Sequence, residues 1–231
     1  MRKVNLILAA AIGGWLAGST PLVVQAAGPG DATTNLTTVS DGFELAADGT
    51  PSVAISSAQF FIDGGTLALM QVPDLTFGRS SVGALIQGPQ TLHLQAGSIP
   101  KDSDAPGFDG SANQQIVVRD FRGTNAGWTL TAQLGQFKNL TSAKTLTATK
   151  ATLGDGGISG DNVQTIALAT ADFTSNATAI LTAPVERGSG TTTVQLADAT
   201  IDLPQTVNAT AGEYRAPLNW VLGAQPIPVA P

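Results

Sequence analysis

Residues 127–134, GWTLTAQL, are the stretch of this chain that decides its fold class. The apolar side chains fall at every second position: Trp128, Leu130, Ala132 and Leu134. The positions between them hold Thr, Thr and Gln. A period of two is the repeat of a β-strand that buries one face and leaves the other in contact with polar surroundings. The stretch therefore predicts a strand whose apolar face carries a tryptophan and a leucine side by side.

A second stretch, residues 218–222 (LNWVL), repeats the Trp-x-Leu spacing at Trp220 and Leu222. The chain has only three tryptophans, and one of them lies in the first 20 residues, so this spacing takes both of the others. One interpretation is a pair of core side chains packed between sheets. The other is an exposed aromatic and aliphatic platform on which sugar rings stack. The scarcity of large residues favours core burial, and the platform stays open as the alternative.

The rest of the chain also favours strands. Alternating apolar runs occur at residues 91–95, 165–169, 194–196 and 201–203, and the change of parity between the last two predicts a bulge or a short turn. Turn or loop signals rich in Gly, Pro and Asp separate them at residues 63–65, 88–89, 105–107, 154–157, 188–190 and 211–212. No stretch has a convincing amphipathic helical period. We expect an all-β fold, a β-sandwich or irregular barrel of short, mostly antiparallel strands.

The N-terminal residues have the pattern of a secretory signal peptide. A basic pair precedes a mostly apolar run over residues 4–16, and the small residues up to Ala26 suit a cleavage site. We expect a signal peptide over residues 1–26, with a retained membrane anchor as the alternative, and no membrane span after it. Residues 27–231 are expected to form one domain. The polar stretch over residues 101–113 is expected to be a long surface loop, or alternatively a boundary between two halves.

Charge and cysteine content exclude several classes of partner. Without the predicted signal peptide, the chain has 9 basic and 17 acidic residues, a net charge of −8. The basic residues are scattered, which argues against binding to nucleic acid or to anionic phospholipid. The chain has no cysteine, and this fits an exported bacterial protein. Any surface that it binds is expected to be recognised through shape, hydrogen bonds or bridging cations.

Few residues could carry catalysis or bind a metal. His93 is the only histidine, and it falls on the polar side of a predicted strand, where a solvated side chain is the simplest expectation. Three aspartates in residues 101–113 resemble the start of a calcium loop, but Pro106 stands at a ligand position. The three glutamates belong to no recognisable acid or nucleophile motif. We expect no catalytic residue, no metal and no cofactor, and a protein that is not an enzyme.

The two Trp-x-Leu stretches lie within longer patterns that resemble a known family. Residues 117–134 (VVRDFRGTNAGWTLTAQL) run from apolar residues through Asp120 and a short Arg-Gly-Thr loop to Gly-Trp-x-Leu. The second pattern begins with residues 201–204 (IDLP), which end in a proline. It continues over residues 212–222 (GEYRAPLNWVL) with Gly-x-Tyr at Tyr214 and then x-Leu-x-Trp-x-Leu. In order, spacing and position, these patterns resemble the first and second signatures of the WxL surface-protein family.

The resemblance is specific over residues 117–222, inside an expected WxL domain over residues 27–231. It implies a protein secreted by Gram-positive bacteria and held non-covalently at the cell surface, where the WxL domain binds peptidoglycan. It also implies companions, namely other WxL proteins and membrane-anchored WxL-interacting proteins. The expected function is attachment to the cell wall as part of a surface complex. The alternatives are a protein-interaction module docked on a WxL-interacting protein, a host-facing adhesin, and a hydrolase of wall or plant polysaccharide.

The expected binding site follows from the two signatures. Its members are the tryptophans and leucines of the two motifs, with an aspartate and a tyrosine as supports: Trp128, Leu130, Trp220, Leu222, Asp120 and Tyr214. We expect the two Trp-x-Leu strands to lie together, and to form one shared surface or one core seam. Pro217 departs from the family pattern, and it should keep the second strand at a sheet edge or make it start late.

Overall fold

The structure, a computed structural model, describes residues 57–96, 113–174 and 176–225, together with the backbone of short strands between residues 31 and 55. The predicted signal peptide and residues 101–112, with the aspartates of the possible calcium loop, lie outside the described residues. The chain divides into two compact units, Met1–Phe61 and Ile62–Pro231. The first unit contains two antiparallel pairs: β1 (Asp31–Ala32) with β4 (Ala54–Ile55), and β2 (Thr37–Val39) with β3 (Gly42–Glu44).

The second unit is built around one long strand, β14 (Gly190–Leu203). On one side β14 pairs with β12 (Lys150–Gly160). On the other side its first half pairs with β8 (Gln115–Asp120) and its second half with β7 (Gln90–Gln95). Two shorter strands complete this sheet, β5 (Leu67–Gln71) beside β8 and β6 (Thr76–Phe77) beside β7. All of these pairings are antiparallel.

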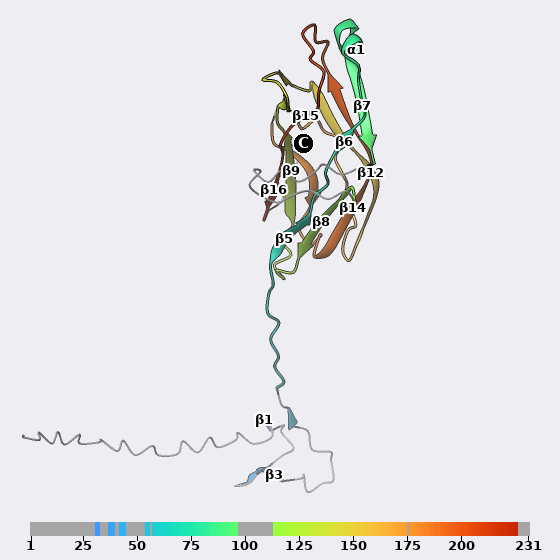
Figure 1. The fold of residues 1–231 in the computed structure, drawn as a ribbon. Coiled ribbons are helices and arrows are strands. Elements are labelled where there is room, and N and C mark those ends of the chain that lie inside the picture. The colour runs from blue at the N-terminus through green and yellow to red at the C-terminus, as the bar shows by residue number, and fades with distance from the viewer. Residues whose placement is uncertain are drawn as a thin grey trace, which may run out of the picture. The chain divides into compact units, whose positions relative to one another are not determined.

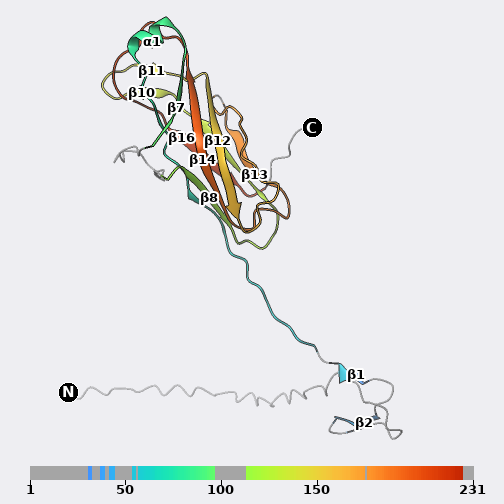
Figure 2. The same cartoon turned by 90° about the vertical axis from the view of Figure 1, so that its right-hand side faces the viewer.

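Two smaller sheets face the large one. In the first, β9 (Trp128–Leu134) lies between β13 (Thr178–Ala183) and β16 (Leu218–Gly223). In the second, β10 (Phe137–Asn139) lies between β11 (Thr145–Leu146) and β15 (Tyr214–Arg215). Figure 1 shows β9 on the opposite side of this unit from β12 and β14, and Figure 2 shows β12 and β14 side by side. Buried side chains from β8, β9, β12, β13 and β14 form one apolar core between the layers. The expected all-β, mostly antiparallel fold is confirmed.

The predicted change of parity lies within β14 as a bulge. Asp198 pairs with Gly154 and Leu196 pairs with Asp155, so Ala197 has no partner on β12. Leu196 is buried, Ala197 is exposed and Ala199 is buried again. One extra residue therefore lets both halves of the strand point their apolar side chains into the same core.

The turn expected over residues 154–157 is wrong, because these residues belong to β12. The strand passes the bulge of β14 at this point, and its register shifts on both sides of Asp155. A Cβ atom on Gly156 would lie 2.9 Å from the backbone nitrogen of Ala197. The glycines here allow two backbones to approach closely, instead of reversing the chain direction.

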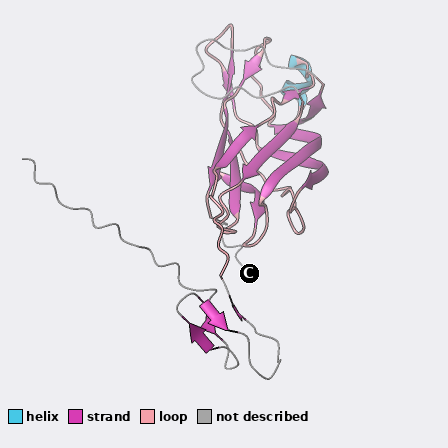
Figure 3. Cartoon of the chain, turned by 90° about the horizontal axis from the view of Figure 1, so that it is seen from below, coloured by secondary structure: helices cyan, strands magenta, loops and turns pink. Residues whose placement is uncertain are grey.

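Three other expectations of local structure also need correction. A short helix, α1 (Val82–Gln87), is present; Ser81 caps it by accepting a hydrogen bond from the Ala84 backbone over 3.1 Å. Figure 3 shows α1 beside the strands. No helix among the described residues could cross a membrane. Residues 165–169 are not a strand: they form one bridge among the described residues, Leu168 to Leu181, and Thr165 has a φ of 71°. Residues 63–65 are extended and not a turn, with the Gly65 N–H donating to Phe121 O over 2.7 Å.

Candidate functional site

The first Trp-x-Leu motif is part of the core. Trp128 and Leu130 are fully buried on β9, the middle strand of its sheet. The Trp128 indole Nε1–H donates a 3.1 Å hydrogen bond to the Gly188 carbonyl. Gly188 has a φ of +76°, and any side chain there would collide with the indole nitrogen. The burial interpretation is therefore confirmed for this motif, and Trp128 offers no surface to a ligand in this conformation.

The second motif lies directly beside the first. Strand β16 pairs antiparallel with β9, and Trp220 stands opposite Ala132 while Leu222 stands opposite Leu130. Residues that stand opposite each other in a pleated sheet project from the same face, so the apolar faces of both motifs form one seam. The expectation that the two strands lie together is confirmed. Trp220 and Leu222 are only half-buried, however, because β16 is at the edge of its sheet. The edge position expected from Pro217 is confirmed as well.

Asp120 is a brace between the two motifs. Its carboxylate, which is only 5% exposed, accepts hydrogen bonds from Arg122 Nε at 2.9 Å and Arg122 Nη2 at 2.7 Å. The same guanidinium donates to Gly127 O, just before the first motif, and to Ala224 O, just after the second. The Arg122 side-chain hydrogen bonds hold the pKa of Asp120 below its ordinary value, although burial acts in the opposite direction. Asp120 thus supports the site from inside the protein.

Tyr214 fixes the chain that leads into the second motif. It lies on β15, where it pairs with Asn139, and its hydroxyl donates to Thr210 O over 2.9 Å. The buried Asn139 side chain accepts backbone hydrogen bonds from Thr141 and Ser142, and it donates to Ala211 O over 3.3 Å. The loop before Tyr214 is therefore held at several points, and the half-buried phenol ring faces an open space beside β15.

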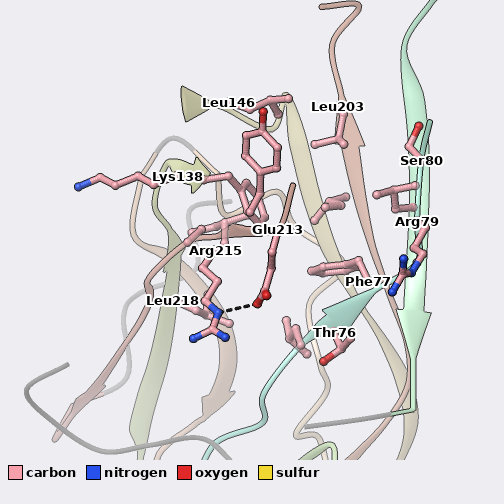
Figure 4. Close-up of a pocket in the computed structure, with 18 of the residues that line it drawn as sticks. Thr76, Phe77, Arg79, Ser80, Lys138, Leu146, Leu203, Glu213, Arg215 and Leu218 are labelled. Atoms are coloured by element: carbon pink, nitrogen blue, oxygen red, sulfur yellow. Dashed lines mark hydrogen bonds and ion pairs between the residues drawn. The ribbon is translucent and has the colours of Figure 1, made fainter. Parts of the chain in front are cut away.

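That space is a groove with a volume of about 1460 Å³, which we call the WxL groove. One wall comes from residues 72–82 and 85, around β6 and the start of α1, and the other comes from β10, β15 and β16. The floor is apolar, with side chains contributed by both layers of the protein: Leu75, Phe77, Leu134, Phe137, Leu203 and Trp220. Figure 4 shows Phe77 and Leu203 on one side of this space and Leu218 with Arg215 on the other. Of the two motif tryptophans, Trp220 lines the groove and Trp128 does not.

Charged groups stand at the walls of the WxL groove. Arg215 Nε donates to Glu213 Oε1 over 2.7 Å, and Figure 4 shows this pair opposite Arg79. Arg79 makes no hydrogen bond or ion pair with any described residue. Lys138 contributes its stem, and its ammonium points away from the groove (Figure 4). Asp74 also belongs to the lining. A ligand that enters the groove therefore meets an apolar floor and, at Arg79, a cation that forms no ion pair with a described residue.

Two strand edges meet the WxL groove. Strand β6 is bonded only to β7 and strand β16 only to β9, as far as the described residues show, and both strands contribute lining side chains. The hydroxyl oxygen of Thr76, on β6, is buried and has no hydrogen-bond partner in the described part of the chain. An unsatisfied buried hydroxyl costs about 1–3 kcal/mol, so this part of β6 is less stable than a fully bonded strand.

Sequence reasoning did not find Leu75, Phe77 or Arg79 as parts of the site. They precede the first signature and belong to no motif, and only the pairing of β6 with β7 brings them opposite the second signature. The lone His93 lies elsewhere, exposed on β7, where its Nδ1 is 2.9 Å from Asp198 Oδ2. The hydrogen bond from His93 lowers the pKa of the Asp198 carboxyl, which is itself close to the surface. The pair is a solvated cross-strand contact, as expected for His93.

Comparison with known proteins agrees with the two signatures. A family model described as WxL domain surface cell wall-binding matches residues 61–226, which include both motifs and every residue of the WxL groove. No curated protein matches the chain. The match covers well over half of the sequence and supports attachment to the cell wall, and with it a location at the cell surface. The chain belongs to the WxL domain family of surface proteins that bind the cell wall.

Proposed function

We propose that this chain is secreted by a Gram-positive bacterium and stays on the wall non-covalently, because its WxL groove binds peptidoglycan. One observation carries the proposal: of the two signature tryptophans, Trp128 is enclosed and Trp220 lines an open groove. A ligand can therefore contact the second motif only, and the first motif acts as the scaffold that holds it in place.

The chemistry of the groove suits a polymer with both apolar and acidic groups. Peptidoglycan offers sugar C–H faces, methyl groups and free carboxylates on its short peptides. The apolar faces suit the floor around Phe77 and Trp220, because indole and phenyl rings pack against C–H surfaces. A carboxylate suits Arg79, since a guanidinium binds carboxylates through two parallel hydrogen bonds. A local cation also helps an acidic protein to approach an anionic polymer.

We propose binding without catalysis. Glycoside hydrolysis needs a pair of carboxyl groups that flank the scissile bond. Asp74 and Glu213 both line the groove, but the carboxylate of Glu213 is held by Arg215 at 2.7 Å, so its position is set by an ion pair. Incubation of the purified chain with wall polymer should release no soluble fragments, and release of reducing ends would contradict this part of the proposal.

The binding proposal is tested by sedimentation with purified sacculi that carry no other protein. Arg79→Glu should raise the apparent dissociation constant about tenfold or more, since a charge-assisted hydrogen bond contributes roughly 1.5–3 kcal/mol. Arg119→Glu is the matched control, because Arg119 is exposed on β8 outside the groove and the change in net charge is the same. Equal binding by the wild type and both variants would exclude the groove as the wall site.

A second candidate function is a protein-interaction module that docks on a membrane-anchored WxL-interacting protein. The observation that favours it is the position of the groove between two free strand edges, where an extended peptide could add as a strand. Retention by intact cells that carry the partner, without retention by bare sacculi, would favour this candidate. Retention by bare sacculi favours direct binding to the wall.

A further inference from the structure

Three large apolar side chains lie exposed in a row just before β5. Phe60, Phe61 and Ile62 are 81%, 81% and 85% exposed, and the backbone around them is neither helix nor strand. Exposed apolar patches on soluble proteins mark sites of interaction. Asp63 follows them and is also exposed. We call residues 58–63 the FFID segment. Its composition is that of an unpaired strand, apolar in the middle and acidic at its end.

The FFID segment complements the WxL groove in apolar character, in strand pairing and in charge. The groove floor is apolar and the segment carries three large apolar side chains. The groove lies between edges of β6 and β16 that pair with no other described strand, and an extended backbone can pair with such an edge. Arg79 is a cation with no partner among the described residues, and Asp63 supplies a carboxylate next to the apolar side chains.

Within the second unit, Asp63 and the groove lie at opposite ends of β5. Gly65 N–H donates to Phe121 O over 2.7 Å, and Leu67 pairs with Asp120, so Asp63 is held close to the start of β5. The groove lies beside β6, after the far end of β5. A second copy of the chain has no such restriction, because its segment can approach the groove from solvent.

We propose that the FFID segment of one copy adds as a strand in the WxL groove of a second copy, with Asp63 paired to Arg79. The two surfaces are different patches of the same molecule, so the contact is heterologous and head to tail. Such contacts produce rings or open chains of subunits instead of a closed twofold dimer. This inference goes beyond wall attachment. It uses the groove and the Arg79 side chain that we assign to wall polymer, so a groove that holds the segment of a second copy cannot bind the wall at the same time.

The test is the mass of the mature chain in solution, measured by light scattering and sedimentation without sacculi. The wild type should associate as its concentration rises. The triple change Phe60→Ser, Phe61→Ser, Ile62→Ser should leave a monomer, because it removes the apolar contact without touching the core. Asp63→Lys alone and Arg79→Asp alone should each raise the dissociation constant at least tenfold. A mixture of these two single variants should associate again, because opposite charges then face each other in both contacts.

A peptide with the sequence of residues 57–63 provides a second measurement. It should change the fluorescence of the wild-type chain through Trp220, which lines the groove, and it should do so much less in Trp220→Phe. The same peptide with serine at the three apolar positions is the control. A wild type that stays monomeric at high concentration, or variant mixtures that fail to associate, would overturn the inference. Binding to sacculi is scored separately on the monomeric triple variant, so failure of this inference and failure of wall binding are distinguishable.

Discussion

The two Trp-x-Leu motifs have the same spacing and lie on paired strands, yet they have different surroundings. Strand β9 has a bonded neighbour on each side, and Trp128 is fully buried with its indole N–H satisfied. Among the described strands, β16 has a bonded neighbour only on the β9 side, and Trp220 is half-buried beside the WxL groove. The difference arises from the position of each strand in the sheet and not from the motif.

This comparison teaches that a repeated motif need not repeat a role. The first motif stabilises the fold, and the second uses that stability to hold an indole at an opening. The brace formed by Asp120 and Arg122 connects the two, because the guanidinium contacts Gly127 at one motif and Ala224 at the other. Changes in the first motif should therefore act mainly on stability, and changes in the second mainly on binding.

The largest expected effect is that of Trp128→Ala. Removal of a fully buried indole leaves a cavity and an unpaired Gly188 carbonyl, and the expected loss is about 3–5 kcal/mol of unfolding free energy. Denaturant unfolding followed by circular dichroism measures this loss. If Trp128→Ala cost less than Trp220→Ala, the contrast between a structural and an exposed motif would be refuted.

Asp120→Asn should have the next largest effect. It keeps the shape of the side chain but leaves the partly buried Arg122 guanidinium without its counter-ion, which costs about 3 kcal/mol at neutral pH. Because the folded-state pKa of Asp120 is lowered, its contribution is complete above the unfolded-state pKa of about 3.9 and is lost as the pH falls through the lower folded-state pKa.

Measurement of unfolding free energy against pH checks this prediction. The difference between the wild type and Asp120→Asn should be constant near neutral pH and should shrink below about pH 4. The carboxyl of Asp198, whose pKa is lowered by His93, titrates equally in both chains and so cancels in the difference. A difference that does not change with pH would mean that the ion pair is not the source of the stability.

Parts of this arrangement are readable from local sequence patterns. Alternation predicts β9 and its buried face, the parity change predicts the bulge of β14, and Pro217 predicts an edge strand. These features depend on the period of two and on the missing proline N–H, which are properties of a few neighbouring residues.

The WxL groove could not be predicted in this way. Its two walls come from segments more than 50 residues apart, and no local pattern states that β6 lies across from β16. The six residues of α1 are too few to show a helical period. The glycines over residues 154–157 suggest a turn unless the bulge on the neighbouring strand is known. Pairing between distant strands decides each of these features.

Trp220→Ala should destabilise the protein less than Trp128→Ala, by about 2 kcal/mol, because the side chain is half-exposed before the change. Its effect on binding to sacculi should be larger in proportion, since Trp220 lines the groove. Sedimentation at a temperature where both chains are folded separates the two effects. Val221→Ala is the matched control on the same strand, because Val221 is exposed and does not line the groove. If both variants bound sacculi like the wild type, Trp220 would have only a packing role.

The smallest effect on stability, about 1 kcal/mol, is expected for Trp220→Phe, which keeps an aromatic ring in the seam and removes only part of its area.

This variant also allows the exposure of the two tryptophans to be compared by fluorescence. After cleavage of the predicted signal peptide, the wild type has two indoles, and acrylamide should quench the emission of Trp220 but not that of the enclosed Trp128. Trp220→Phe should therefore lose the quenchable part of the emission and keep the protected part. Saturation of the groove with sacculus fragments should protect Trp220 of the wild type from acrylamide, so that its quenching becomes as low as that of Trp220→Phe. If the emission left in Trp220→Phe were still readily quenched, Trp128 would be reached by solvent, and the two motifs would differ less than their burial indicates.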